Sequence, residues 1–132
     1  SDLMPPTLMS WDHALIDDFI NTYKVVILKP IFDYGGNGIL AIKAGDPNLK
    51  GILEIYQKLY NTPPIFQQFL PEVAQGDKRI ILINGKPVGI VKRMPPKGEI
   101  RSNMRLGGLP EACDFSQRDR EICARLFPTL KE

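Results

Sequence analysis

The sequence predicts an α+β fold, in which short antiparallel strands are packed against helices, and three patterns support this prediction. Residues 25–43 contain an apolar run, a glycine-rich loop and a second alternating run, which indicates two strands joined by a flap. The dipeptide Asn84-Gly85 lies between two further apolar runs and indicates a β-hairpin. Apolar residues at helical spacing in residues 15–23 and 49–60 predict two helices.

Composition narrows the class of protein. A chain of 132 residues can bury one core, and 43% hydrophobic with 24% charged residues is typical of soluble globular domains. A formal charge of +2 gives no indication of nucleic-acid binding. No apolar run reaches membrane-spanning length and no signal peptide stands at the start, so we expect a cytoplasmic protein without a nucleic-acid or membrane partner.

Candidate metal and redox residues are few. Cys113 and Cys123 show no CxxC spacing, so we expect reduced, mostly packed thiols. His13 is the one histidine, and without a second histidine neither a zinc site nor a serine-type triad is expected.

The first two helices have recognisable ends. Ser10 or Asp12 can cap the first one, and Asp46 can cap the second with Pro47 at its first helical position, where the missing N–H costs nothing. The positions of the first helix expected to face the core are Leu15, Ile16, Phe19, Ile20 and Tyr23. In the second they are Leu49, Ile52, Leu53, Tyr56, Leu59 and Tyr60.

The flap between the first two strands is a candidate phosphate site. Glycines such as Gly35, Gly36 and Gly38 let backbone N–H groups approach an anion because no Cβ blocks the way. A Walker-type or dinucleotide loop would open a helix, whereas residues 39–43 alternate like a strand. Two interpretations remain open: a flap over a triphosphate with Lys29 as point charge, or a wide hairpin loop with a solvated lysine.

Residues 65–70 form the next predicted strand, which Pro71 ends. Gln67 and Gln68 could read the polar edge of an adenine with their amide groups. They could equally be polar residues that face water on an edge strand.

The Asn84-Gly85 turn sets the predicted register of the hairpin. A two-residue turn places Ile83 opposite Lys86 and Arg79 opposite Ile90. Arg79 and Arg93 then lie on opposite faces of a regular ladder. Any role that needs both arginines in one site therefore predicts a bulge, or a strand end that leaves the sheet.

Residues 94–110 form a long segment with no obvious secondary structure. Its cations Lys97, Arg101 and Arg105 lie between glycines and prolines, which suits a mobile cover over an anionic ligand, although a solvated loop also fits. After it, Ser116-x-x-Asp119 resembles a capping box, and Pro128 is expected to kink or end the helix that follows.

Taken in order, these segments resemble the bacterial glutathione synthetases, a family of the ATP-grasp superfamily. The resemblance covers nearly the whole chain. The residues that carry it are Ile27-Leu28-Lys29-Pro30, Gly35-Gly36, Gly45-Asp46-Pro47-Asn48-Leu49, Gln67-Gln68-Phe69-Leu70, Gly76-Asp77-Lys78-Arg79, Arg93-Met94-Pro95, Gly98-Glu99-Ile100-Arg101-Ser102-Asn103, Gly107-Gly108 and Pro128-Thr129-Leu130-Lys131-Glu132.

The resemblance implies an incomplete ATP-grasp fold with two small lobes of antiparallel sheet and packed helices. Residues 1–64 would be the small lobe with the flap, and residues 65–132 part of the large lobe, with a mobile loop at 94–110. The implied ATP contacts are Lys29, Gly35, Gly36, Gly38, Gln67, Gln68, Phe69, Leu70 and Asp77. Arg79 and Arg93 would be the catalytic arginines, and the implied substrate contacts of the loop are Arg101, Asn103, Gly107 and Gly108.

The family joins γ-glutamylcysteine and glycine. ATP first phosphorylates the cysteinyl carboxylate, and the amine of glycine then displaces the phosphate. ATP and Mg²⁺ are therefore the implied cofactors, but the metal ligands of the family lie beyond Glu132, so we expect this chain alone to bind nucleotide weakly and to lack ligase activity. A homo-oligomer is left open for the full-length protein.

Two alternatives stay open at this point. One is another ATP-grasp carboxylate–amine ligase, such as a D-alanine–D-alanine ligase-like or glutamate-adding enzyme. The other is a non-catalytic module whose basic loop binds an anionic partner.

Overall fold

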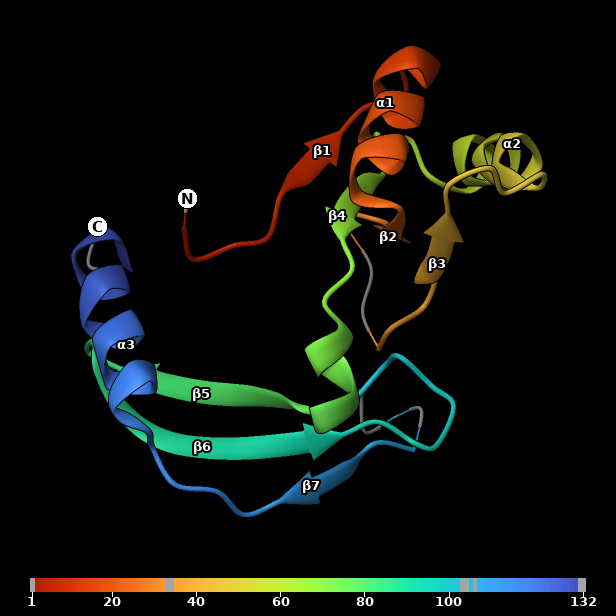
Figure 1. The fold of residues 1–132 in the computed structure, drawn as a ribbon. Helices are drawn as coiled ribbons and strands as arrows, with labels where there is room; N and C mark the ends of the chain where they lie inside the picture. The colour runs from red at the N-terminus through yellow and green to blue at the C-terminus, as the bar shows by residue number, and fades with distance from the viewer. Residues whose placement is uncertain (1, 33–34, 103–104, 106, 131–132) are drawn as a thin grey trace. The chain divides into compact units, whose positions relative to one another are not determined.

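The computed structural model describes residues 2–32, 35–102, 105 and 107–130, and the chain divides into two units, Ser1–Pro71 and Glu72–Glu132 (Figure 1). We call them unit 1 and unit 2. The strand at residues 65–68, which the resemblance assigned to the large lobe, pairs with two strands of unit 1. None of the helices described has the length and apolar character that a membrane crossing requires.

Unit 1 is a four-stranded antiparallel sheet with two helices. The sheet has the strand order β1-β4-β2-β3, so the first strand of the chain pairs with the last strand of the unit. In chain order the elements are β1 (Thr7–Met9), α1 (His13–Tyr23), β2 (Val25–Lys29), β3 (Leu40–Lys43), α2 (Leu49–Leu59) and β4 (Ile65–Gln68). The strands predicted on both sides of the flap are confirmed, and the second begins at Leu40.

Both helices of unit 1 cover the same face of its sheet (Figure 1). Alternate strand residues point to this face, where they meet apolar side chains of α1 and α2. The cluster consists of Ile16, Ile20, Val26, Leu28, Ile42, Leu53, Tyr56 and Phe66, all at most 4% exposed. This core fixes the sheet, and the opposite face of the sheet is left without a helix of unit 1.

The helix ends in unit 1 differ in part from the predictions. Asp12 caps α1 as expected, because its Oδ1 accepts from the N–H groups of Ala14 and Leu15. Leu15, predicted to face the core, is 53% exposed. Asp46 does not cap α2: its Oδ1 accepts from the N–H of Asn48 in a turn that precedes the helix.

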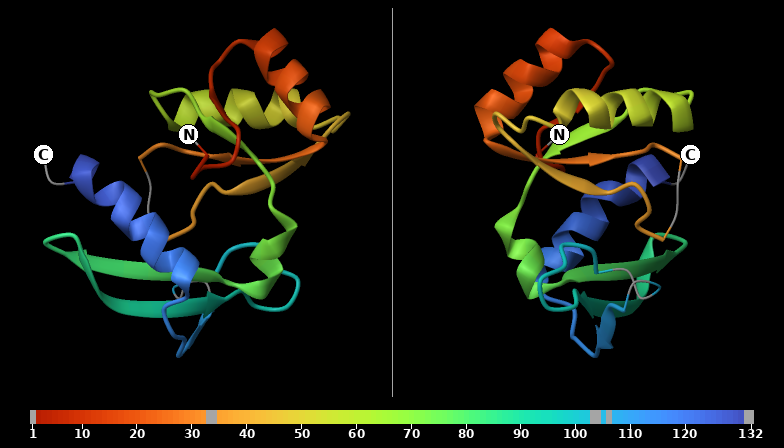
Figure 2. Two further views of the ribbon diagram at one scale, coloured as in Figure 1. Left: turned by 60° about the vertical axis from the view of Figure 1, so that its left-hand side comes forward. Right: turned by 90° about the vertical axis from the view of Figure 1, so that its right-hand side faces the viewer.

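Unit 2 is a three-stranded antiparallel sheet with one long helix (Figure 2). The strand order is β5-β6-β7, so the hairpin is extended by a short strand that follows the loop after residue 94. The elements are a 3₁₀ turn, η1 (Pro71–Gln75), then β5 (Asp77–Ile83), β6 (Lys86–Met94), β7 (Leu109–Glu111) and α3 (Gln117–Leu130). The segment predicted to lack structure thus ends in a strand.

The predicted hairpin turn is confirmed, but part of the predicted strand register is wrong. Asn84 and Gly85 both have positive φ angles, as the predicted turn requires, and Ile83 pairs with Lys86. Arg79, however, pairs with Val91 instead of Ile90, because the register shifts between Ile81 and Leu82. The shift leaves one extra residue in β6, next to a proline that cannot donate to the ladder.

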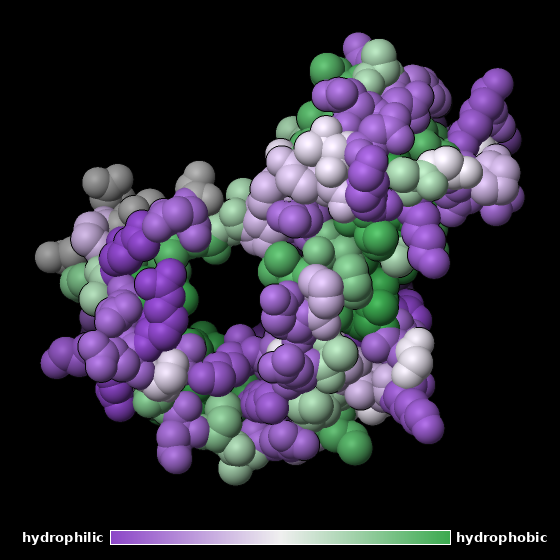
Figure 3. Space-filling view, viewed as in Figure 1, coloured by the Kyte–Doolittle hydropathy of each residue, from purple (hydrophilic) through white to green (hydrophobic). Residues whose placement is uncertain are grey.

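The capping box of α3 is confirmed. The N–H of Ser116 donates to Asp119 Oδ2 at 2.8 Å, and the N–H of Asp119 donates to Ser116 Oγ at 3.1 Å. Pro128 does not end the helix, which continues to Leu130. Hydrophilic side chains dominate the visible surface of α3 (Figure 3).

Candidate functional site

The face of the unit 1 sheet opposite to the helices carries the predicted lysine. Lys29 and Ile27 alternate with the buried Val26 and Leu28, so their side chains point away from α1 and α2. Gln67 pairs with Ile27 across the strands and shares this face. We call it the helix-free face of unit 1. Two of the predicted nucleotide contacts, Lys29 and Gln67, are therefore brought together.

Lys29 is held at the end of β2. Its Nζ donates to Oε1 of Gln67 at 2.8 Å, and partial burial lowers the pKa of its ammonium group below the usual value. No carboxylate forms an ion pair with Lys29 among the residues that the structure describes. The positive charge thus remains available to an anion.

The glycine loop follows within a few residues. Gly35, Gly36 and Gly38 have φ angles of +76°, +84° and +64°, a backbone region that L side chains rarely adopt. At Gly38 a Cβ would lie 2.8 Å from the hydroxyl of Tyr60, so a larger residue would need a rearrangement. The hydroxyl of Tyr56 donates to the carbonyl of Gly38 and ties the loop to α2. Residues 33–34 lie outside the described part of the chain.

This loop and lysine fit a phosphate group. Glycines with positive φ angles can turn backbone N–H groups toward an anion, and a missing Cβ leaves room for an oxyanion. A lysine with an unpaired charge at the adjoining strand end supplies the attraction that a polyphosphate needs.

The remaining residues of the predicted adenine segment have different environments. Gln68 pairs with the buried Val26, so its side chain lies on the helix-covered face and not beside Gln67. The N–H of Phe69 donates to the carbonyl of Val25 at 3.1 Å. The N–H of Leu70 donates to no other backbone group within the described residues.

In unit 2, the bulge places the two predicted arginines on one face. Asp77 pairs with Arg93, and Arg79 lies two residues further along β5, so the three side chains share a face. Arg93 donates from Nε and Nη2 to both carboxylate oxygens of Asp77, at 2.7 and 2.9 Å. The opposite face bears Lys78, which is paired with Asp119 of α3 at 2.6 Å. Arg79 and Arg93 thus lie on the face away from α3.

The segment after β6 is organised by a carboxylate that the sequence did not single out. Glu99 accepts from the N–H groups of Ile100 and Arg101 at 2.9 and 3.2 Å, and from the guanidinium of Arg101 at 2.6 Å. The bond from Arg101 is the main reason that the pKa of Glu99 falls to about 2. Gly107 has a φ angle of +90°, and Asn103 lies outside the described residues. Gly108 is buried.

Three residues that contact predicted site residues were not themselves predicted from the sequence. Glu99 could have been found, because it belongs to the segment whose resemblance was noted. Tyr56 looked like any core position of an amphipathic helix, and its hydroxyl contact with the glycine loop depends on tertiary packing. Thr7 donates to the carbonyl of Pro5 and accepts from Nε2 of Gln67, both at 2.8 Å, which no local pattern indicates.

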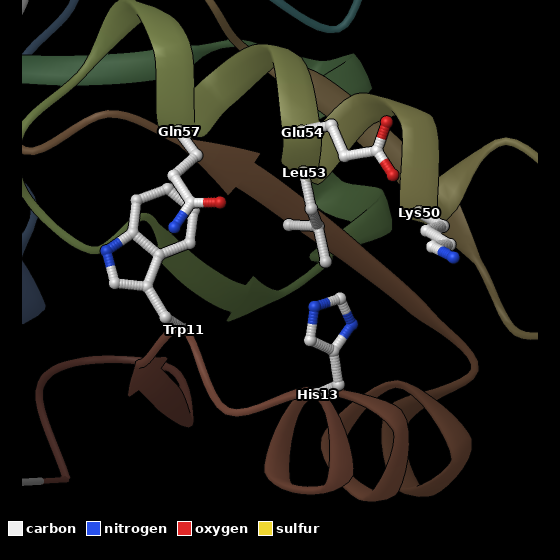
Figure 4. Close-up of a pocket in the computed structure, with 6 residues that line it drawn as sticks. All are labelled: Trp11, His13, Lys50, Leu53, Glu54 and Gln57. Carbon is white, nitrogen blue, oxygen red and sulfur yellow. The ribbon is translucent and has the colours of Figure 1, made fainter.

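A separate cavity of about 260 Å³ lies between α1 and α2 (Figure 4). Figure 4 shows the His13 ring directed from the start of α1 toward Leu53 of α2. The full lining is Trp11, His13, Lys50, Leu53, Glu54 and Gln57. It lies on the helix side of the sheet, so it is distinct from the face that carries Lys29. Among the described residues, no three His, Cys, Asp or Glu side chains form a group that could hold a metal ion.

The fold is that of ATP-grasp ligases. A solved structure of "ATP-grasp ligase PsnB complexed with minimal precursor, Mg, and ADP" superposes with a TM-score of 0.60 over 94% of this chain and 37% of that one, at 21% identity. The same ligase with a phosphomimetic precursor variant, Mg and ADP gives a TM-score of 0.58 over 92% of this chain and 35% of that one, at 20% identity. At such identity the likeness establishes the fold alone.

The particular family follows from sequence. Residues 1–132 match the family described as "Prokaryotic glutathione synthetase, ATP-grasp domain", and the chain belongs to this family. It is 47% identical over 131 residues to the glutathione synthetase of Brucella melitensis, covering 99% of this chain and 42% of that protein. It is 43% identical over 132 residues to the one from Mesorhizobium japonicum, with 100% and 42% covered. The chain thus spans about two fifths of the length of these relatives.

Proposed function

We propose that residues 1–132 are the ATP-binding portion of a glutathione synthetase. The complete protein joins γ-glutamylcysteine and glycine through an acyl phosphate, with ATP hydrolysed to ADP and phosphate. Membership of the family supports the assignment. The observation that carries the nucleotide-binding role is a partly buried lysine without a carboxylate partner, fixed where the positive-φ glycine loop begins.

Within unit 1, each nucleotide contact has a physical basis. Lys29 attracts the phosphates, and the N–H groups of residues 35–38 donate to their oxygens. The N–H of Leu70 is available to an adenine nitrogen, whereas that of Phe69 is already bonded to β2. Gln67 and Gln68 point to opposite faces, so we do not expect both amide groups to read the base.

Within unit 2, arginines stabilise the charge that develops during the reaction. Arg93 is fixed by both oxygens of Asp77, which keeps its guanidinium in one orientation. Asp77 therefore acts on the site through Arg93. Arg79 and Arg101 supply further charge for phosphate or substrate carboxylates, and Gly107 gives the loop the conformational freedom of a cover that excludes water.

Magnesium is the second proposed cofactor, as in the ATP-grasp structures that hold Mg and ADP. When bound, it neutralises phosphate charge. We propose that its protein ligands lie outside residues 1–132. The cytoplasm is the proposed location, where thiols remain reduced.

The assignment of the reaction is tested on the complete protein by ADP release. Release is expected only when ATP, γ-glutamylcysteine, glycine and magnesium are all present. Replacing the substrate pair with D-alanine, or with glutamate as the amine, should give only background release. Turnover with a replacement pair but not with γ-glutamylcysteine and glycine would establish a different ATP-grasp ligase.

The role of Lys29 is tested by replacing it and, as a control, by replacing a second lysine of the same sheet. Lys29→Met is expected to raise KM for ATP roughly tenfold or more, because a hydrogen bond to a charged group contributes about 1.5–3 kcal/mol. Lys43 is paired with Val25 at the other end of the β2–β3 ladder and is exposed, so Lys43→Met should change KM less than about twofold. Equal effects of the two variants would contradict a specific role for Lys29.

A further inference from the structure

We infer that Thr7 and Gln67 form a positioning relay for Lys29, and that Gln67 serves the nucleotide site through this lysine and not by reading the base. The inference rests on the proposed nucleotide-binding role of Lys29. Three hydrogen bonds of 2.8 Å make up the relay: Lys29 to Gln67, Gln67 to Thr7, and Thr7 to the carbonyl of Pro5. It crosses three adjacent strands, β2, β4 and β1.

The hydrogen bonds of the relay run in one direction, because each group has a limited number of donors and acceptors. The hydroxyl of Thr7 has a single hydrogen, which it donates to Pro5, so toward Gln67 it can only accept. The amide nitrogen of Gln67 must therefore face Thr7, and its oxygen faces Lys29. A flipped amide would set NH₂ against the ammonium group and leave a carbonyl oxygen against a hydroxyl whose hydrogen is already used. β1 thus determines which end of the amide meets the lysine.

An amide suits this position better than a carboxylate. The oxygen of Gln67 orients Nζ by a hydrogen bond but carries no net charge, so the attraction of Lys29 for an anion is preserved. A glutamate there would form an ion pair with Lys29 and compete with a phosphate for the same ammonium hydrogens. The fixed orientation lowers the entropy that Lys29 loses when an anion binds.

The first experiment needs no nucleotide. Gln67→Glu is expected to raise the pKa of Lys29, measured by NMR on the labelled side chain of this chain, because a carboxylate favours the charged ammonium. Thr7→Val, which removes the hydroxyl at nearly constant volume, should change the Nζ environment of Lys29, and Thr7→Ser should restore it. Met9→Ala is the control, since Met9 lies on the same face of β1 and is 57% exposed. A Lys29 resonance that is identical in all variants overturns the relay.

The second experiment uses the complete protein and separates KM from kcat. Thr7→Val is expected to raise KM for ATP roughly 3- to 10-fold, the effect of one lost hydrogen bond, with kcat within about twofold, whereas Thr7→Ser and Met9→Ala stay near wild type. Gln67→Glu should raise KM more than Gln67→Leu, because it adds a competing charge. Far-UV circular dichroism checks that each variant is folded.

The outcomes distinguish the alternatives. If Gln67→Leu changes the preference for ATP over GTP while Thr7→Val has no effect, the amide reads the base and the relay is wrong. If the wild-type protein binds no ATP, but Thr7→Val still alters the Lys29 resonance, the relay stands and the proposed function fails. If Thr7→Val and Gln67→Glu both raise KM and alter the Lys29 resonance, the positioning role is established.

Discussion

Units 1 and 2 both carry cationic side chains on one face of a sheet, but different interactions stabilise the two units. Each has an antiparallel sheet with helix on one face and candidate cations on the other, Lys29 in unit 1 and Arg79 with Arg93 in unit 2. Among the described residues, every buried apolar side chain except Cys123 belongs to unit 1. Unit 2 relies on the hairpin ladder and on ion pairs, including Lys78 with Asp119 and Arg93 with Asp77.

This difference explains why the two units orient their cationic side chains in different ways. In unit 1, apolar packing below the sheet fixes the backbone, so a single amide suffices to orient Lys29. In unit 2, where apolar burial is small, a bidentate carboxylate orients Arg93 directly. We therefore expect unit 1 to be sensitive to core truncation and unit 2 to be sensitive to charge.

The largest expected effect tests the core of unit 1. Phe66 is fully buried, and Phe66→Ala should destabilise unit 1 by about 3–5 kcal/mol, through lost burial and the cavity left behind. Ile81→Ala in unit 2, at a side chain 53% exposed, should cost under about 1 kcal/mol. Urea unfolding followed by hydrogen exchange in each unit measures both. Equal losses in the two variants would remove the contrast between the units.

The next effect tests the glycine loop. Gly38→Ala combines a φ angle of +64° with a Cβ placed 2.8 Å from the Tyr60 hydroxyl, so we expect about 3 kcal/mol of destabilisation and weaker nucleotide binding. Gly45 has a φ angle of +77°, but no described heavy atom lies within 4 Å of its Cβ position. Gly45→Ala should cost about 1 kcal/mol from the backbone alone. The difference between the two unfolding energies isolates the steric contribution.

The smallest effect tests the polar start of α3 in unit 2. Ser116→Ala removes one half of the capping box and should cost about 1 kcal/mol. The hydrogen bond from Lys78, followed by those from Ser116, lowers the pKa of Asp119 from 3.8 to about 2. A carboxyl with a depressed pKa stabilises the folded state above pH 4, and this contribution is lost as the pH falls toward 2.

Unfolding of unit 2 measured between pH 6 and pH 2 should therefore show a decline below pH 4 that is smaller in Asp119→Asn. A decline of the same size in both proteins would assign the acid sensitivity to other carboxyls.

The sequence predicted local features well where one physical cause dominated. The turn at Asn84-Gly85, the cap at Asp12 and the capping box at Ser116 depend on residues within a few positions of each other, and all three are confirmed. The pairing of Arg79 was wrong, because a bulge beside Pro87 shifts the register. Pro128 was expected to kink or end α3, and it does not end the helix, which continues to Leu130.

The candidate site was predictable only in part, for a topological reason. Lys29 and the glycine loop were visible as a local motif, and Arg79 with Arg93 required the bulge that the structure contains. The partners of Lys29 depend on the strand order β1-β4-β2, which sets Thr7 against a residue 60 positions later. No periodicity in one sequence reveals such a contact.

That strand order also has a consequence for synthesis of the chain. β1 pairs only with β4 in the described sheet, so β1 must wait for Ile65, Phe66 and Gln67 to leave the ribosome before it acquires its partner. Until then its apolar residues and unpaired backbone are open to chaperones or to misassembly. A pause in translation before β4 has left the ribosome should therefore prolong this vulnerable interval, whereas a pause after β4 has left it should not.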